Sequence, residues 1–172
     1  IISTILFCAV LYVFLGLFFK TTKRRLLAFT ITLFSSGLGF VATHVGIDSS
    51  DLWIPESITF LSLQEAPHFV LSQALMLISF YLLIRGWLDK RVSYLIFSGI
   101  PLLFLGFEHP YNLFVLAGVV VLAGLYLVLS RKIEKRQSLW GVGSILLGCV
   151  IGNAYQLFEL YRNPILKSWA FQ

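Results

Sequence analysis

Two short segments of the chain each combine an acid, a histidine and a proline where a long apolar run meets a loop. The first covers residues 65–69 (EAPHF) and the second covers residues 107–112 (FEHPYN). Carboxylates and imidazoles exchange protons near neutral pH, so these residue types suit general acid–base chemistry. We therefore predict four catalytic residues that converge in one pocket: Glu65, His68, Glu108 and His109.

Each segment also has a plainer interpretation. Glu65 and His68 have the Glu-x-x-His spacing of metal ligands on a helix, but Pro67 lies between them and disfavours a continuous helical turn. An acid near a helix start is stabilised by the positive end of the helix, so capping is the favoured interpretation of this pair. Glu108 and His109 either line a cavity at membrane depth, where ionisable groups are usually functional, or belong to a solvated turn.

The last apolar run carries two further patterns. One is a polar stripe with three-residue spacing, formed by Asn153, Gln156 and Glu159. It either lines a cavity or makes hydrogen bonds between helices. The other is a set of small residues with four-residue spacing, Ser144, Gly148 and Gly152, and Ser35 and Gly39 repeat this spacing earlier in the chain. Such spacing predicts close helix contact in a membrane.

The composition indicates a membrane protein. Of the 172 residues, 58% are hydrophobic and 12% are charged, and the mean hydropathy is +0.88. Soluble domains carry about 25% charged residues, and a domain of this length cannot hide so large an apolar excess from water. The net charge of +5 does not indicate nucleic-acid binding, because the basic residues are confined to short loops.

Apolar runs long enough to cross a bilayer, or nearly so, predict an all-α polytopic transmembrane helix bundle. The expected spans are residues 1–19, 26–45, 67–87, 92–107, 110–130 and 139–160. A short interfacial helix is expected within residues 52–63, which could equally be a loop. We expect residues 1–172 to be a single membrane domain within a longer protein, because Ile1 already lies inside an apolar run.

The loops between these runs alternate in charge. Three loops hold eleven of the thirteen basic residues with only Asp89 and Glu134 as acids, and all three histidines fall at the opposite ends of the runs. The positive-inside rule predicts that the basic loops are cytoplasmic and that the acidic, histidine-bearing loops lie outside an inner cell membrane.

Several short pieces, in this order, resemble bacterial polytopic proteins of the C-type glycosyltransferase superfamily. They are residues 36–39 (SGLG), 51–56 (DLWIPE), 67–69 (PHF), 109–112 (HPYN) and 163–169 (NPILKSW). The resemblance implies transfer of a sugar from a polyprenyl-phosphate donor on the outer face of the membrane. It also implies a loop carboxylate that acts as base or metal ligand, often with a divalent metal ion.

A polyprenyl-phosphate donor would need cations and polar groups at the same end of the bundle, since a buried phosphate without a cation is strongly unfavourable. The expected substrate-binding residues are Arg162, Lys167, Tyr111 and Asn112. Two other functions stay open from the sequence. The chain can be a non-catalytic scaffold or lipid-binding subunit, or a transporter segment with the polar stripe as its pathway.

Overall fold

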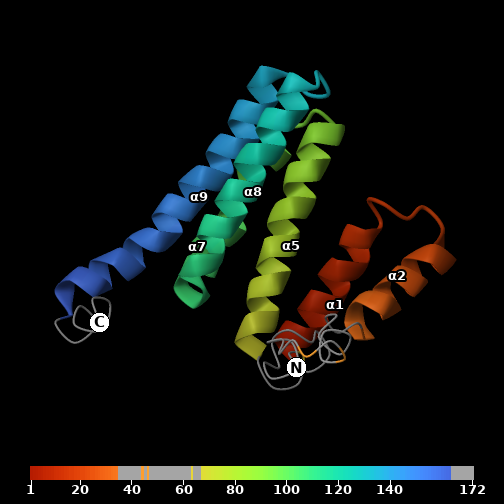
Figure 1. Ribbon diagram of the computed structural model, residues 1–172, viewed down its shortest axis with the longest axis horizontal. Coiled ribbons are helices and arrows are strands. Elements are labelled where there is room, and N and C mark those ends of the chain that lie inside the picture. Colours follow the sequence, from red (N-terminus) through yellow and green to blue (C-terminus); the bar gives the residue numbers. More distant parts are fainter. Residues whose placement is uncertain (35–43, 45, 47–62, 64–66, 164–172) are drawn as a thin grey trace. The chain divides into compact units, whose positions relative to one another are not determined.

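The computed structural model describes residues 1–34, 44, 46, 63 and 67–163. Every regular element in these ranges is a helix (Figure 1), which confirms the predicted all-α class. The chain divides into two compact units, Ile1–Leu77 and Ile78–Gln172. The expected interfacial helix at 52–63 and the Ser35 and Gly39 pair lie outside the described residues, apart from Leu63.

The first unit contains α1 (Ile2–Leu15), α2 (Thr22–Phe34) and the first half of α5 (Pro67–Leu88). Its core forms because apolar residues recur every four positions along one face of α1. Phe7, Leu11 and Leu15 are buried there and belong to one cluster with Val70 and Ala74 of α5. Burial of this stripe fixes which face of α1 points inward.

The basic loop of the first unit packs back onto its own helices. The Arg25 guanidinium donates hydrogen bonds to the Phe19 carbonyl and lies 5.1 Å from the centre of the Tyr12 ring. Tyr12 in turn packs edge-on against Phe29 at a centroid distance of 6.0 Å. These contacts close the turn between α1 and α2.

The second unit contains the second half of α5, α6 (Val92–Phe97), α7 (Ile100–Glu108), α8 (Pro110–Leu129) and α9 (Lys135–Arg162). Helix α9 packs against α6, α7 and α8. It starts at a capping box, in which the Glu134 side chain accepts from the Gln137 backbone and the Gln137 side chain accepts from the Glu134 N–H. Leucines from α6, α7 and α8 are buried in this unit, as is Ile145 of α9.

The number of possible membrane spans is lower than expected. In place of six, three helices in the described ranges are long and apolar enough to cross a membrane, namely Pro67–Leu88, Pro110–Leu129 and Lys135–Arg162. The first expected span is a helix only over Ile2–Leu15. The second is described as α2, which runs Thr22–Phe34, and the rest of that span lies outside the described residues.

The fourth expected span, 92–107, is broken into α6 and α7. Pro101 has no N–H and cannot bond the Phe97 carbonyl, so the helical ladder stops there. The break also lets the backbone of Gly99 pack directly on Ser144 of α9, where a Cβ would collide. Ser79 of α5 donates a 2.7 Å hydrogen bond to the Ser98 carbonyl and satisfies one acceptor that the break exposes.

The outer surfaces of α8 and α9 are apolar. Large hydrophobic side chains there are mostly exposed: the exposed fractions are 70% for Phe114 and 69% for Leu122 of α8, and 67% for Val150 of α9. A soluble protein rarely exposes so continuous an apolar surface. Together with the length of the three helices, this surface suits a bilayer.

Candidate functional site

The corner between α7 and α8 holds the part of the predicted site that the structure describes best. Glu108 is the last residue of α7, His109 caps both helices, and Pro110 begins α8. Pro110 suits this place, because the first helical turn needs no N–H from it. The backbone of His109 has φ −141° and ψ 75°, outside the helical range, which turns the chain between the two helices.

The imidazole of His109 is buried and paired with a tyrosine. Only 5% of His109 is exposed, whereas Tyr111 is 55% exposed. The Tyr111 hydroxyl oxygen lies 2.6 Å from His109 Nδ1, and the two rings pack edge-on with centroids 5.3 Å apart. When Nδ1 carries no proton, the tyrosine hydroxyl donates to it. The tyrosine therefore links a buried base to the surface of the corner.

Helix α9 supports this corner from one side. The Gln156 amide donates a 3.2 Å hydrogen bond to the Phe107 carbonyl near the end of α7. The rings of Phe107 and Tyr155 pack at a centroid distance of 5.1 Å. The Phe107 carbonyl has lost its continuing helical partner because Pro110 and Tyr111 belong to the next helix. Gln156 supplies a donor in its place.

The polar stripe of α9 makes structural bonds at two of its three positions. Gln156 bonds across to α7, as above, and Asn153 is buried and donates a 3.2 Å bond to the Cys149 carbonyl one turn earlier in α9. Glu159 is half-buried. The interpretation as hydrogen bonding between helices therefore holds for Gln156, and within one helix for Asn153.

The small-residue stripe confirms its prediction of close contact. A Cβ on Gly148 would collide with the backbone of Gly99, and a Cβ on Gly152 would lie 2.6 Å from the Leu102 carbonyl oxygen. Gly106 and Gly152 meet backbone to backbone. This contact fixes α7 against α9 only three residues before His109.

The remaining predicted residues are placed as follows. Glu108 is exposed at the end of α7, and Asn112 is half-buried in the first turn of α8. Arg162, the last residue of α9, is exposed, and its guanidinium lies 5.9 Å from the Phe158 ring centre. Because it follows Gln156 by six residues, it lies about 9 Å further along the helix axis. Glu65 and Lys167 lie outside the described residues.

The structure brings together only part of the predicted catalytic set. Glu108 and His109 belong to one corner of the second unit, together with the predicted substrate-binding residues Tyr111 and Asn112. His68 is exposed at the start of α5 in the first unit, where its ring packs against Phe69. The convergence of the two acid–histidine segments therefore stays a prediction.

The described part of the corner does not form a metal site. Across the described ranges, no group of three or more His, Cys, Asp and Glu residues is arranged to hold a metal ion. At the corner itself, His109 Nδ1 is hydrogen-bonded to the Tyr111 hydroxyl, and Glu108 is exposed. We therefore derive no chemistry through a metal ion at this corner.

Comparisons with known proteins identify no relative. No protein-family model, no curated protein and no solved structure matches the chain.

The pairing of His109 with Tyr111 was not foreseen from the sequence, although both residues were in the predicted set. Residues two apart in a helix do not face each other. Here the turn at His109 breaks the helix and allows the contact. The signal that was available is the proline that follows His109, which places the histidine outside α8.

Proposed function

We propose that this chain is a multi-pass membrane domain of a glycosyltransferase-like protein. In this proposal the corner between α7 and α8 receives the phosphate-sugar head of a polyprenyl lipid. The observation that carries the proposal is the buried His109 imidazole joined to the exposed Tyr111 hydroxyl at 2.6 Å. It adds to the resemblance between the sequence and C-type glycosyltransferases.

The geometry supports a proton relay for sugar transfer. An acceptor hydroxyl attacks the anomeric carbon of the sugar, and the bond from that carbon to the lipid phosphate oxygen breaks with its electron pair. The acceptor proton moves to the Tyr111 oxygen while Tyr111 passes its own proton to His109 Nδ1. Such proton transfer contributes about 10²–10⁴-fold to a rate. The lipid phosphate leaves as an anion.

Arg162 is the proposed partner of that phosphate. Its planar guanidinium can hold two phosphate oxygens at once, and it is exposed at the end of α9. Among the described residues, its guanidinium lies 5.9 Å from the centre of the Phe158 ring and forms no ion pair with Glu159. Within the described residues, no carboxylate therefore competes with a phosphate for the guanidinium.

The proposed topology places the corner outside and the basic turns in the cytoplasm of an inner cell membrane. Helix α8 has 20 residues and so spans about 30 Å, the thickness of a hydrocarbon core. It connects the His109 corner at one end to Arg131 and Lys132 just beyond the other. The positive-inside rule then orients the basic turn inward.

The test uses the full chain with a labelled polyprenyl-phosphate sugar and matched variants. Tyr111→Phe removes one hydroxyl and should lower transfer about 10²-fold or more. Tyr155→Phe makes the same change near the same corner, at a ring that packs on Phe107, and should leave transfer unchanged. Arg162→Ala should weaken donor binding about 10–100-fold, the value of hydrogen bonds to a charged group. Arg136→Ala, at the opposite end of α9, is its control.

A second candidate function is a non-catalytic membrane scaffold. The backbone contact of Gly106 with Gly152 and the bond from Gln156 to the Phe107 carbonyl favour it, because both give α9 a purely structural role beside the corner. Unchanged donor binding in Arg162→Ala, together with unchanged transfer in Tyr111→Phe, would reject the transferase proposal and leave the scaffold.

A further inference from the structure

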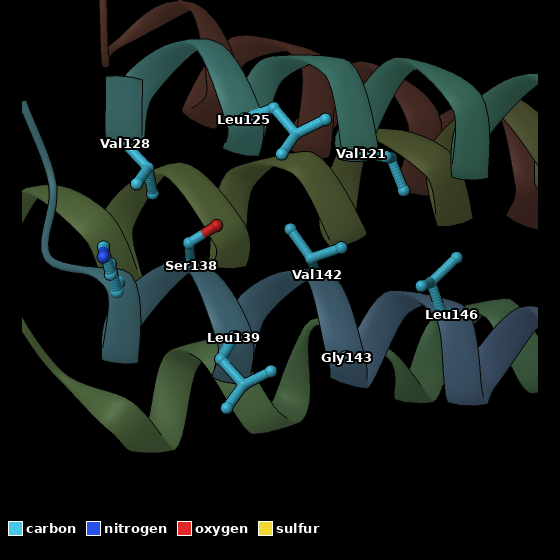
Figure 2. A pocket seen from close by; sticks show the side chains of 9 residues that line it. Val121, Leu125, Val128, Ser138, Leu139, Val142, Gly143 and Leu146 are labelled. Carbon is cyan, nitrogen blue, oxygen red and sulfur yellow. The ribbon is translucent and has the colours of Figure 1, made fainter. Parts of the chain in front are cut away.

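An apolar groove runs along the line where α8 meets α9, at the end far from the His109 corner. Its volume is about 320 Å³. Figure 2 shows side chains of the two helices lining it, among them Val121, Leu125 and Val128 of α8 and Ser138, Val142 and Leu146 of α9. Gly143 also lines the groove, and a Cβ on Gly143 would meet no atom within 4 Å. An apolar chain fits such a lining.

A basic hollow of about 330 Å³ adjoins this groove. The hollow lies at the turn between α8 and α9 and shares Val128 and Lys135 with the groove. Its charged lining residues are Lys90, Arg131, Lys132, Lys135 and Glu134. Four cations face one carboxylate there, so the hollow carries a net positive charge of three, counted as four minus one. The apolar groove therefore ends at this basic hollow.

The single carboxylate of the hollow is already engaged. Glu134 accepts from the backbone of Gln137 in the capping box and lies 3.9 Å from the Lys90 ammonium. Arg131 and Lys135 form no ion pair with any described residue. Lys135 is also the first residue of α9, where the positive end of the helix disfavours a cation. An anion in the hollow would relieve this repulsion.

We propose that the hollow and the groove together bind one anionic phospholipid of the surrounding membrane. The lipid phosphate contacts Arg131 and Lys135, and one acyl chain lies between α8 and α9. Charge complementarity favours this occupant, because an amphiphile with an anionic head matches an apolar groove that ends in a basic hollow. This site is separate from the proposed donor site, since α8 places the two at its opposite ends.

The proposal that an acyl chain lies in the groove is tested by a substitution that fills the groove. Gly143→Leu adds a side chain at the edge that the groove shares with a second apolar hollow, where a Cβ meets no atom within 4 Å, so the fold has no collision to relieve. Gly118→Leu is the matched control, because Gly118 is also an open helical glycine but lines neither the groove nor the hollow. Native mass spectrometry of the detergent-solubilised full chain measures bound phosphatidylglycerol. We expect at least tenfold weaker binding for Gly143→Leu and no change for Gly118→Leu.

The head-group part is tested by removing charge. The double variant Arg131→Gln/Lys135→Gln should bind phosphatidylglycerol about 30-fold more weakly, since each cation near a lipid surface contributes roughly fivefold. The control Lys23→Gln/Arg136→Gln removes the same charge from residues outside the hollow. Circular dichroism and the thermal midpoint of each variant confirm that the fold is retained.

Two ligands separate the sources of affinity. Phosphatidylcholine with the same acyl chains should bind at least tenfold more weakly than phosphatidylglycerol, and free glycerol 3-phosphate should compete only weakly. Equal binding of both phospholipids would overturn the proposal for the basic hollow. Full competition by glycerol 3-phosphate, or unchanged binding in Gly143→Leu, would overturn the proposal for the groove.

Discussion

Replacing Gly152 with alanine should destabilise the second unit, although alanine is the better helix former. A Cβ at this position would lie 2.6 Å from the Leu102 carbonyl oxygen, and ordinary contact begins at 3.4 Å. The two helices would therefore have to separate by about 0.8 Å, which is 3.4 minus 2.6. A gap of this size forfeits a quarter to a half of the dispersion energy of the facing atoms.

The size of the effect follows from two opposing terms. Overpacking of a core costs about 1–3 kcal/mol, and the upper end applies because the obstructing atom is a backbone oxygen that cannot rotate away. Alanine in place of glycine contributes about 1 kcal/mol to the helix. The net loss in the free energy of unfolding is therefore about 2 kcal/mol.

Gly118→Ala is the matched control for Gly152→Ala. A Cβ on Gly118 would meet nothing within 4 Å, so only the propensity term applies and the variant should gain about 1 kcal/mol. Reversible unfolding in mixed micelles, followed by circular dichroism and tryptophan fluorescence, measures both. The two variants should differ by about 3 kcal/mol. A Gly152→Ala protein as stable as Gly118→Ala would refute the close contact between α7 and α9.

Three further predictions concern the start of α9, its bond to α7 and the topology. Glu134→Ala removes the capping box and should lower the free energy of unfolding by about 1 kcal/mol, whereas Glu134→Ser keeps a capping oxygen and should lose only a few tenths. Gln156→Leu removes the bond to the Phe107 carbonyl and should cost about 0.6 kcal/mol in the same unfolding assay. In a Cys8→Ala/Cys149→Ala background, Ser138→Cys should react with a membrane-impermeant thiol reagent from the cytoplasmic face and Ser50→Cys from the outer face. Labelling of both cysteines from one face would contradict the proposed topology.

The sequence predicts two of the long helices to within a residue at either end. The expected span 67–87 is observed as Pro67–Leu88, and the expected span 110–130 is observed as Pro110–Leu129. Both runs begin with a proline, which suits the first helical turn, and both are followed by charged residues. Where apolar length and a stop signal agree, the helix limits are readable.

The other limits depend on effects that apolar length does not measure. Helix α9 begins at Lys135, four residues before the expected start, because Glu134 and Gln137 form a capping box within a segment that looks like a basic loop. The Glu-x-x-Gln spacing was a readable signal for this start. Pro101 was visible inside the run 92–107, but its effect depends on whether neighbouring groups satisfy the freed carbonyls. Here the Ser79 hydroxyl donates to the Ser98 carbonyl, which lowers the free-energy cost of the break.

The candidate sites differ in how far the sequence can predict them. The corner residues were identifiable because an acid, a histidine and a proline are rare together at the end of an apolar run. The hydrogen bond between His109 and Tyr111 could not be predicted from the sequence, because it depends on the backbone angles of one turn. The basic hollow was also hidden, since loop charges look alike in sequence whether or not an adjoining groove exists.

Helix α9 divides the second unit into regions with different packing, and this division explains where ligands can bind. Along Gly148 and Gly152 its backbone touches the neighbouring helices, which leaves no room for a ligand. Near its start Gly143 faces open space beside the groove, because no neighbouring backbone approaches it there. Glycine thus allows close backbone contact in one part of α9 and leaves free space beside the helix in another, depending on what it faces. In the proposed phospholipid site the acyl chain lies at the open part, while the closed part holds α7 against α9 beside the His109 corner.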